Sequence, residues 1–197
     1  MDIGAFMSGF SVIDLLLFLL FAAFFVLGFA QGTIRRVIGI GSILFSFLFA
    51  ANLADPLGSF LGANWTQFPR EYSYMIGFGT VFLAATLAFA LVAQSFYKPQ
   101  PLFEKARFVD EILGGFLGVV EFGLILIATL VILDSFFTLR GIAVDASELP
   151  FLREFWNALD SSSIVDFFRS NLIPGFIAVF DLFIPDRLEV LYPGAVA

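Results

Sequence analysis

Residues 112–137 read ILGGFLGVVEFGLILIATLVILDSFF, and this run contains only two charged side chains, Glu121 and Asp134. A helix that crosses a bilayer needs about 20 consecutive, mostly apolar residues. The run is longer than that. It shows neither the polar face of a soluble amphipathic helix nor the strict alternation of a barrel strand. The sequence therefore predicts a transmembrane helix here.

Three further runs, all on the N-terminal side, have the same length and apolar character. We expect each of them to cross the membrane as well, which gives an all-α integral membrane protein with four transmembrane helices. Together the four runs make residues 1–137 a membrane domain. The predicted spans cover residues 11–30, 33–54, 74–97 and 112–137.

The composition excludes several classes of protein. Of 197 residues, 60% are apolar and 29 are phenylalanine, and the net charge of −7 argues against a nucleic-acid binder, which needs a basic surface. Cysteine and histidine are both absent, which excludes disulfides, cysteine-ligated metals and histidine-based catalysis. The sequence also lacks the common nucleotide-binding and hydrolase motifs. We therefore expect no enzyme, no cofactor and no metal site.

The connections between the predicted spans indicate two hairpins. A tight turn at Gln31 and Gly32 joins the first two spans, and residues 98–111 join the last two. Residues 55–73, between the hairpins, are rich in glycine, proline and asparagine, a composition that is typical of loops.

Positive charges are distributed unevenly over these connections. Counting Arg35 and Arg36 just after the first turn, five Lys and Arg residues lie in or next to the first and third connections, against three near the membrane on the opposite side. Cytoplasmic loops of membrane proteins are enriched in these residues. Both termini are therefore predicted outside the cytoplasm, and Arg35 and Arg36 are expected to anchor the first hairpin at the cytoplasmic headgroups.

Residues 138–197 are predicted to form an extracytoplasmic tail of amphipathic helices rather than another span. Pro150 suits the first turn of a helix, and apolar residues recur after it at helical spacing. Ser163 followed by Asp166 resembles a capping box that opens a second short helix. The apolar residues 175–184 are too few to cross a bilayer. The tail is expected to pack against the spans, with contact to lipid or to a partner groove as alternatives.

Glu121 lies near the middle of the fourth predicted span, where a carboxylate is costly and is by default a candidate functional residue. Gly114, Gly118 and Glu121 fall on one helix stripe, and the two glycines allow another helix to approach closely. Glu121 should therefore face a helix neighbour rather than lipid. Three roles are open: a proton- or cation-handling group in a transport path, a structural hydrogen bond to a neighbouring helix, and pairing with a partner subunit.

Other polar and small residues near the span ends have simpler interpretations. Gly28 and Gly32 repeat the four-residue glycine spacing, so we expect them to lie at a helix-packing surface. Asp14 and Asp134 lie near the outer ends of the first and fourth spans, and Asp14 is expected to meet water there.

Two short motifs carry a family resemblance. The first is GFAQG at residues 28–32, followed by Arg35 and Arg36, and the second is DEILGGFLG at residues 110–118. With the four predicted spans and the chain length, these motifs resemble the colicin V production protein family of bacterial inner-membrane proteins. The resemblance extends over residues 12–137.

The chain departs from that family at two charged positions. Glu111 and Glu121 stand where the family pattern carries basic residues, so the chain resembles a divergent member. The resemblance implies a plasma-membrane protein linked to colicin V export and envelope upkeep, and the family offers no catalytic residues to transfer.

These inferences lead to one main hypothesis and two alternatives. We expect a non-enzymatic accessory protein, multi-pass in the bacterial inner membrane, that supports toxin export or envelope integrity. The alternatives are a small proton- or ion-coupled transporter or channel subunit that uses Glu121, and a structural subunit of a larger membrane complex. The expected partners are the lipid bilayer and either further copies of this chain or other membrane proteins.

Overall fold

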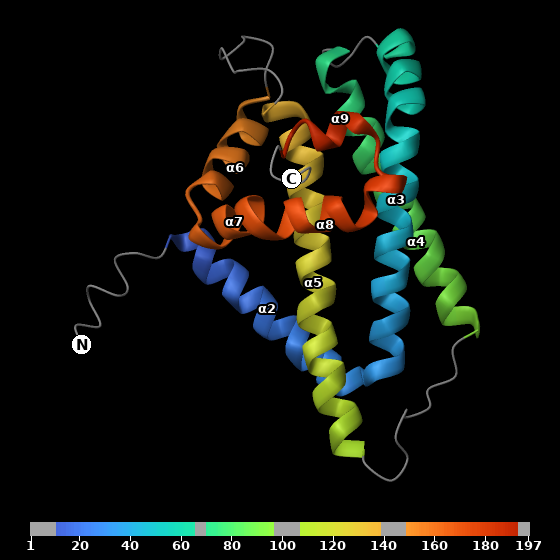
Figure 1. Ribbon diagram of the computed structural model, residues 1–197, viewed down its shortest axis with the longest axis vertical. Helices are drawn as coiled ribbons and strands as arrows, with labels where there is room; N and C mark the ends of the chain where they lie inside the picture. The colour runs from blue at the N-terminus through green and yellow to red at the C-terminus, as the bar shows by residue number, and fades with distance from the viewer. Residues whose placement is uncertain (1–10, 66–69, 97–106, 139–148, 193–197) are drawn as a thin grey trace, which may run out of the picture.

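A computed structural model describes residues 11–65, 70–96, 107–138 and 149–192. Within these ranges the chain is helical and forms no strand, so the predicted all-α fold class is confirmed. Five helices are long and apolar enough to cross a membrane, one more than the sequence analysis expects. They are α2 (Val12–Gln31), α3 (Thr33–Asn64), α4 (Ser73–Phe96), α5 (Arg107–Phe137) and a composite helix over Ser163–Phe183 (Figure 1).

The start of α2 and its junction with α3 are set by local hydrogen bonds and one glycine. Ser11 and Asp14 form a capping box at the start of α2. Gly32 ends α2 with a φ of 77°, a conformation that favours glycine, and its N–H donates to the Gly28 carbonyl at 2.9 Å. Because α3 begins at Thr33, no loop separates the two helices, and Figure 1 shows them diverging from this junction.

The packed pairs are not the two predicted hairpins. α3 packs along α4, and α2 packs along α5, whereas the predicted hairpin partners, α2 with α3 and α4 with α5, touch far less. Small residues explain the choice of partner. Gly58 of α3 lies against the backbone of Tyr74 at the start of α4, and Gly28 of α2 lies against Gly114 of α5.

α3 extends beyond the span predicted for it. The prediction of a loop over residues 55–73 is wrong at both ends, because α3 continues through Pro56 to Asn64 and the short helix η1 (Arg70–Tyr72) precedes α4. Proline usually disrupts a helix since it lacks the N–H. Here the helix continues past the proline, and Gly58, two residues later, packs against the backbone of Tyr74 at the start of α4. The 32 residues of α3 span about 48 Å, which exceeds the roughly 30 Å hydrocarbon core.

α5 begins earlier than predicted. Its first turns include residues 107–111, which the sequence analysis places in a connection, and Arg107 Nε donates to Glu111 Oε1 at 2.9 Å along them. Oppositely charged side chains at positions i and i+4 stabilise an exposed stretch of helix.

The C-terminal region forms a series of short helices at one end of the bundle. The helix α7 (Ser163–Phe167), the π-helical turn η2 (Phe168–Leu172) and α8 (Ile173–Phe180) follow each other without a break and run across the long axis of α5 in Figure 1. The hydroxyl that caps α7 belongs to Ser162 and not to Ser163 as predicted, since Ser162 accepts from the N–H of Val165. The remaining elements are α6 (Pro150–Asp160), η3 (Asp181–Phe183) and α9 (Asp186–Glu189).

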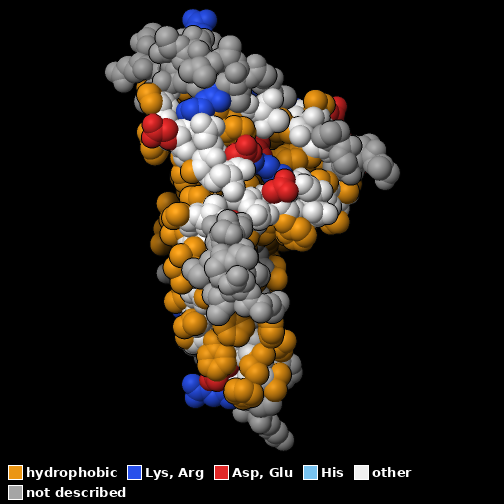
Figure 2. Space-filling view, turned by 90° about the vertical axis from the view of Figure 1, so that its left-hand side faces the viewer, with side chains coloured by type: hydrophobic (Ala, Val, Ile, Leu, Met, Phe, Trp, Pro, Cys, Tyr) orange, Lys and Arg blue, Asp and Glu red, His pale blue; other side chains and the backbone are white. Residues whose placement is uncertain are grey.

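The outer surface of the long helices is largely apolar. Many large hydrophobic side chains on α2, α3, α4 and α5 are exposed, among them Phe18, Phe45, Leu87 and Phe116. On the face seen in Figure 2, hydrophobic side chains cover the lower part of the molecule, and charged side chains gather in the upper part and at the lower end. Such a surface fits an apolar solvent and not water.

Candidate functional site

The closest helix contact in the bundle brings the four predicted packing glycines together. Gly28 and Gly114 lie so close that a Cβ on either would collide with the other's backbone, and a Cβ on Gly118 would collide with the Phe24 carbonyl. A Cβ on Gly114 would also meet the backbone of Gly32. The two motifs that carry the family resemblance are therefore the two surfaces of one helix crossing.

Asp110 ties the start of α3 to this crossing. Its carboxylate accepts from the N–H of Thr33 at 3.4 Å, and the Thr33 hydroxyl donates to the Asp110 carbonyl at 3.0 Å. Besides its positive φ, Gly32 has a second reason to be a glycine: a Cβ at this position would collide with the Asp110 carboxylate. A carboxylate from the first turn of α5 thus supplies a cap for the first turn of α3.

Glu121 forms an ion pair with Arg36 between α5 and α3. Arg36 NH1 donates to Glu121 Oε2, and only 5% of the Arg36 residue surface is exposed. Gly39, one turn after Arg36, leaves the space that the Glu121 carboxylate occupies, since a Cβ there would overlap Oε1. Glu121 therefore faces a neighbouring helix, and a positive charge compensates it there.

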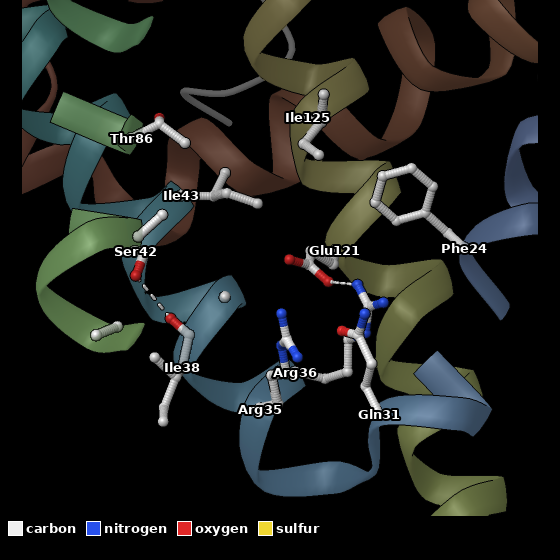
Figure 3. A pocket seen from close by; sticks show the side chains of 13 residues that line it. Phe24, Gln31, Arg35, Arg36, Ile38, Ser42, Ile43, Thr86, Glu121 and Ile125 are labelled. Carbon is white, nitrogen blue, oxygen red and sulfur yellow. Dashed lines mark hydrogen bonds and ion pairs between the residues drawn. The ribbon is translucent and has the colours of Figure 1, made fainter. Parts of the chain in front are cut away.

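A cavity of about 300 Å³ opens beside this pair. Figure 3 shows Glu121 at its edge, with the guanidinium groups of Arg35 and Arg36 turned toward the same space. Four helices contribute to its walls. The polar lining residues are Gln31, Arg35, Arg36, Ser42, Thr86 and Glu121, and the larger apolar ones are Phe24, Ile38, Ile43 and Ile125.

Two polar atoms on the cavity walls have no hydrogen-bond partner within the part of the chain that the structure describes. They are Arg36 Nε and Thr86 Oγ1, and both are buried. Ser42, in contrast, donates its hydroxyl hydrogen to the Ile38 carbonyl at 2.8 Å (Figure 3). Buried polar atoms are rarely left unpaired. These two have almost no accessible surface and lie on opposite sides of the cavity in Figure 3, so a ligand in the cavity does not touch both as the side chains stand.

The structure places Arg36 differently from the sequence-based expectation. It points into the bundle and not toward the headgroups, because Glu121 on α5 offers it a buried counter-charge. Arg35 is exposed, and its anchoring role stays a prediction. Sequence reasoning missed Thr86, which lies in an ordinary apolar stretch and is singled out only by the cavity it lines.

A second buried carboxylate, Asp134 at the other end of α5, holds the C-terminal region. It is 2% exposed and accepts hydrogen bonds from Trp156 Nε1 at 2.9 Å, from two nitrogens of Arg169 at 2.7 and 2.8 Å, and from the Tyr192 hydroxyl at 2.7 Å. Burial and the nearby carboxylate raise the pKa of Tyr192 far above its usual range, which keeps its hydroxyl a donor.

Asp14, at the start of α2, also binds the C-terminal region. It is 1% exposed, so the expectation that it meets water is wrong. Besides its capping bonds with Ser11, its Oδ1 accepts from the Ser162 hydroxyl at 2.6 Å and from the Ile164 N–H at 3.0 Å. Asp14 and Asp134 therefore fasten the C-terminal helices to one end of the bundle.

The arrangement of charges limits the chemistry of the described residues. No group of three metal-ligating side chains lies together among them. A cavity of about 310 Å³ also borders Asp134, Arg169 and Tyr192. The oxygens of Asp14 and Asp134 are occupied by several protein donors, whereas within the described residues Glu121 is bound by Arg36 alone and borders the other cavity. We therefore take the cavity beside this pair as the candidate site.

Comparison with known proteins identifies one family. The family model described as colicin V production protein matches residues 13–171, a stretch that begins in α2 and ends within η2. No curated protein and no solved structure shows a significant match to the chain.

Proposed function

The chain belongs to the colicin V production protein family, and on this premise we propose that it is a non-enzymatic accessory protein of the bacterial inner membrane that supports toxin export or envelope integrity. One observation carries the proposal. The family match takes in all four long helices, and the two family-like motifs form the Gly28–Gly114 crossing that holds α2 against α5. The two family-like motifs thus contribute to the packing of the membrane bundle.

We further propose four membrane spans, with residues 138–197 outside the membrane core. Both ends of the composite helix over Ser163–Phe183 attach to the same end of the bundle. Ser162 binds Asp14 at its start, and the Phe183 carbonyl accepts from Asn52 Nδ2 at 2.9 Å at its end. A helix that crossed the bilayer would have its ends on opposite sides, so this geometry supports a helix that lies along the surface.

The orientation that we propose places both termini outside the cytoplasm. Its support is the excess of Lys and Arg in the first and third connections. In this orientation the Arg36–Glu121 cavity lies toward the cytoplasmic side, and the C-terminal helices lie toward the outer side.

The family assignment leads to a complementation experiment. The chain would be expressed in a colicin V-producing bacterium that lacks its own family member, and active toxin in the medium would be measured beside toxin retained in the cells. Detergent sensitivity of the same cells reports envelope integrity. Recovery of secreted toxin alone supports export, and recovery of detergent resistance alone supports envelope upkeep. Recovery of neither, with the protein present in the membrane, contradicts the proposal.

We propose that the protein acts with partners, either further copies of itself or other membrane proteins. The exposed apolar surface is compatible with both lipid and protein neighbours. Crosslinking in native membranes followed by copurification tests this proposal. A chain that stays monomeric and crosslinks to nothing contradicts it.

A second candidate function is a proton- or ion-coupled transporter subunit, and the cavity beside Glu121 favours it. Arg36 binds the carboxylate in this structure, so transport through Glu121 requires the pair to separate during the cycle. Purified protein in liposomes should then conduct protons or ions, and Glu121→Gln should abolish the flux while the protein stays folded. Absence of flux from the unmodified protein removes this candidate.

A further inference from the structure

We propose that the cavity beside Arg36 and Glu121 is a binding site for a phosphate group, carried either by an anionic lipid or by a free phosphate compound. The inference concerns a ligand and does not depend on the accessory role proposed above. It rests on the charge of the cavity walls and on the size and character of the space.

The charged side chains that line the cavity leave an excess of positive charge. Arg35 and Arg36 both turn toward the space, and among the described lining residues Glu121 is the one carboxylate (Figure 3). Arg36 is bound to that carboxylate, which leaves the guanidinium of Arg35 without a counter-charge among those residues. Because Arg35 is exposed, an anion that compensates it would bind at the open side of the cavity.

The guanidinium groups on the cavity walls favour a phosphate as the bound anion. A guanidinium carries several N–H donors, is always protonated and accepts no hydrogen bond. A phosphate group presents several acceptor oxygens in a compact tetrahedron, and guanidinium groups bind such oxygens with charge-assisted hydrogen bonds. A cation would instead meet two guanidinium groups, so the chemistry of the walls favours an anion.

The space also has room for more than a phosphate. A volume of about 300 Å³ lies at the lower end of the range for small-molecule sites. Phe24, Ile43 and Ile125 give the cavity apolar walls beside the charged ones. A ligand with a phosphate and an adjoining apolar part would use both kinds of wall, and basic pockets between membrane helices are suited to phospholipid headgroups.

The binding experiment uses the full chain, purified in a neutral detergent. It would be incubated with vesicles of either phosphatidylglycerol or phosphatidylcholine, and retained lipid would be counted by native mass spectrometry. In a second arm, inorganic phosphate alone would be titrated by calorimetry. Retention of phosphatidylglycerol over phosphatidylcholine identifies a lipid headgroup, and binding of inorganic phosphate with no lipid preference identifies a free phosphate compound. Binding of neither overturns the proposal.

Variants locate the site. Arg35→Gln should weaken binding by about tenfold or more, since it removes a donor to a charged group. Thr86→Val, across the cavity from the arginines in Figure 3, should weaken it less. Arg107→Gln is the matched control, because Arg107 is exposed and lies outside the cavity. The thermal transition of each variant is measured in parallel. Equal loss in the control, or undiminished binding in Arg35→Gln with its folding intact, contradicts the assignment.

Discussion

The Ser162 hydroxyl donates to Asp14 Oδ1 at 2.6 Å and joins two residues that lie 148 positions apart in the sequence. Through this bond the start of the first long helix holds the start of α7. Asp134 holds the same C-terminal region through Trp156, Arg169 and Tyr192. The C-terminal helices are therefore fixed to the bundle by two buried carboxylates.

Removing the charge of Asp134 should loosen the C-terminal region. Asp134→Asn leaves the half-buried Arg169 without its main counter-charge, and we expect a loss of about 3 kcal/mol in the free energy of unfolding. Limited proteolysis and thermal unfolding in detergent would measure the change. Asp160→Asn is the control, since Asp160 binds the same arginine from an exposed position and should cost less than about 1 kcal/mol. Equal effects of the two variants would contradict the role assigned to Asp134.

A methyl group at the α2–α5 crossing should destabilise the bundle. In Gly118→Ala the new Cβ meets the Phe24 carbonyl, and we expect a cost of about 1–3 kcal/mol because both partners are backbone. Gly41→Ala is the matched control in α3, where a Cβ meets nothing within 4 Å, and it should be neutral or stabilising by up to about 1 kcal/mol. Thermal unfolding of both variants tests the difference, and a Gly118→Ala protein as stable as the control would refute the crossing.

The Arg36–Glu121 pair should behave as a unit. Arg36→Gln and Glu121→Gln each leave one charge without its buried partner, and each should cost about 3–5 kcal/mol. The double variant should be more stable than the sum of the two losses predicts, because no unpaired charge remains from the pair. A double-mutant cycle on unfolding free energies measures the coupling. Strictly additive losses would mean that the two side chains do not interact.

Alkaline pH should release the C-terminal region through Tyr192. The pKa of its hydroxyl is raised in the folded protein, so its contribution to stability is complete below the ordinary tyrosine pKa of about 10 and is lost as the pH rises above it. Proteolysis of the C-terminal region should stay constant from pH 7 to about 10 and increase at higher pH. In Tyr192→Phe this alkaline step should be smaller. An unchanged step in that variant would assign the alkaline effect to other groups.

The number of spans predicts where the C-terminus lies. With four spans both termini are on the outer side, so alkaline phosphatase fused to either end should be active and a fluorescent protein fused to the C-terminus should stay dark. With the segment Ser163–Phe183 as a fifth span the two reporters would give the opposite result at the C-terminus. Fusions to the full chain make this comparison without cutting the C-terminal helices.

Hydropathy and glycine spacing predict much of the fold. The long apolar runs locate α2, α3, α4 and α5, and the pairs Gly28–Gly32 and Gly114–Gly118 name the residues of one crossing. The sequence does not say which helices meet, because every apolar stripe is compatible with every other. The packing of α2 on α5, and not on α3, depends on the complementary shapes of two glycine surfaces.

The sequence predicts Glu121 as a candidate site residue but not its partner, because it does not show which helices meet. A carboxylate inside a span marks Glu121 as unusual, but nothing local links it to Arg36, which lies 85 positions away. An arginine next to a helix start looks like a headgroup anchor until its partner is known. Likewise, Asp14 and Asp134 look solvent-facing when the helices that cover them lie elsewhere in the sequence.

The separation of partners along the chain has a consequence for biogenesis. α3 enters the membrane with the Thr33 N–H uncapped and Arg36 without a counter-ion, since Asp110 and Glu121 follow 77 and 85 positions later. At bacterial synthesis rates this delay is roughly 4–17 s. The buried position of Arg36 is therefore compensated by Glu121 only after α5 has been synthesised.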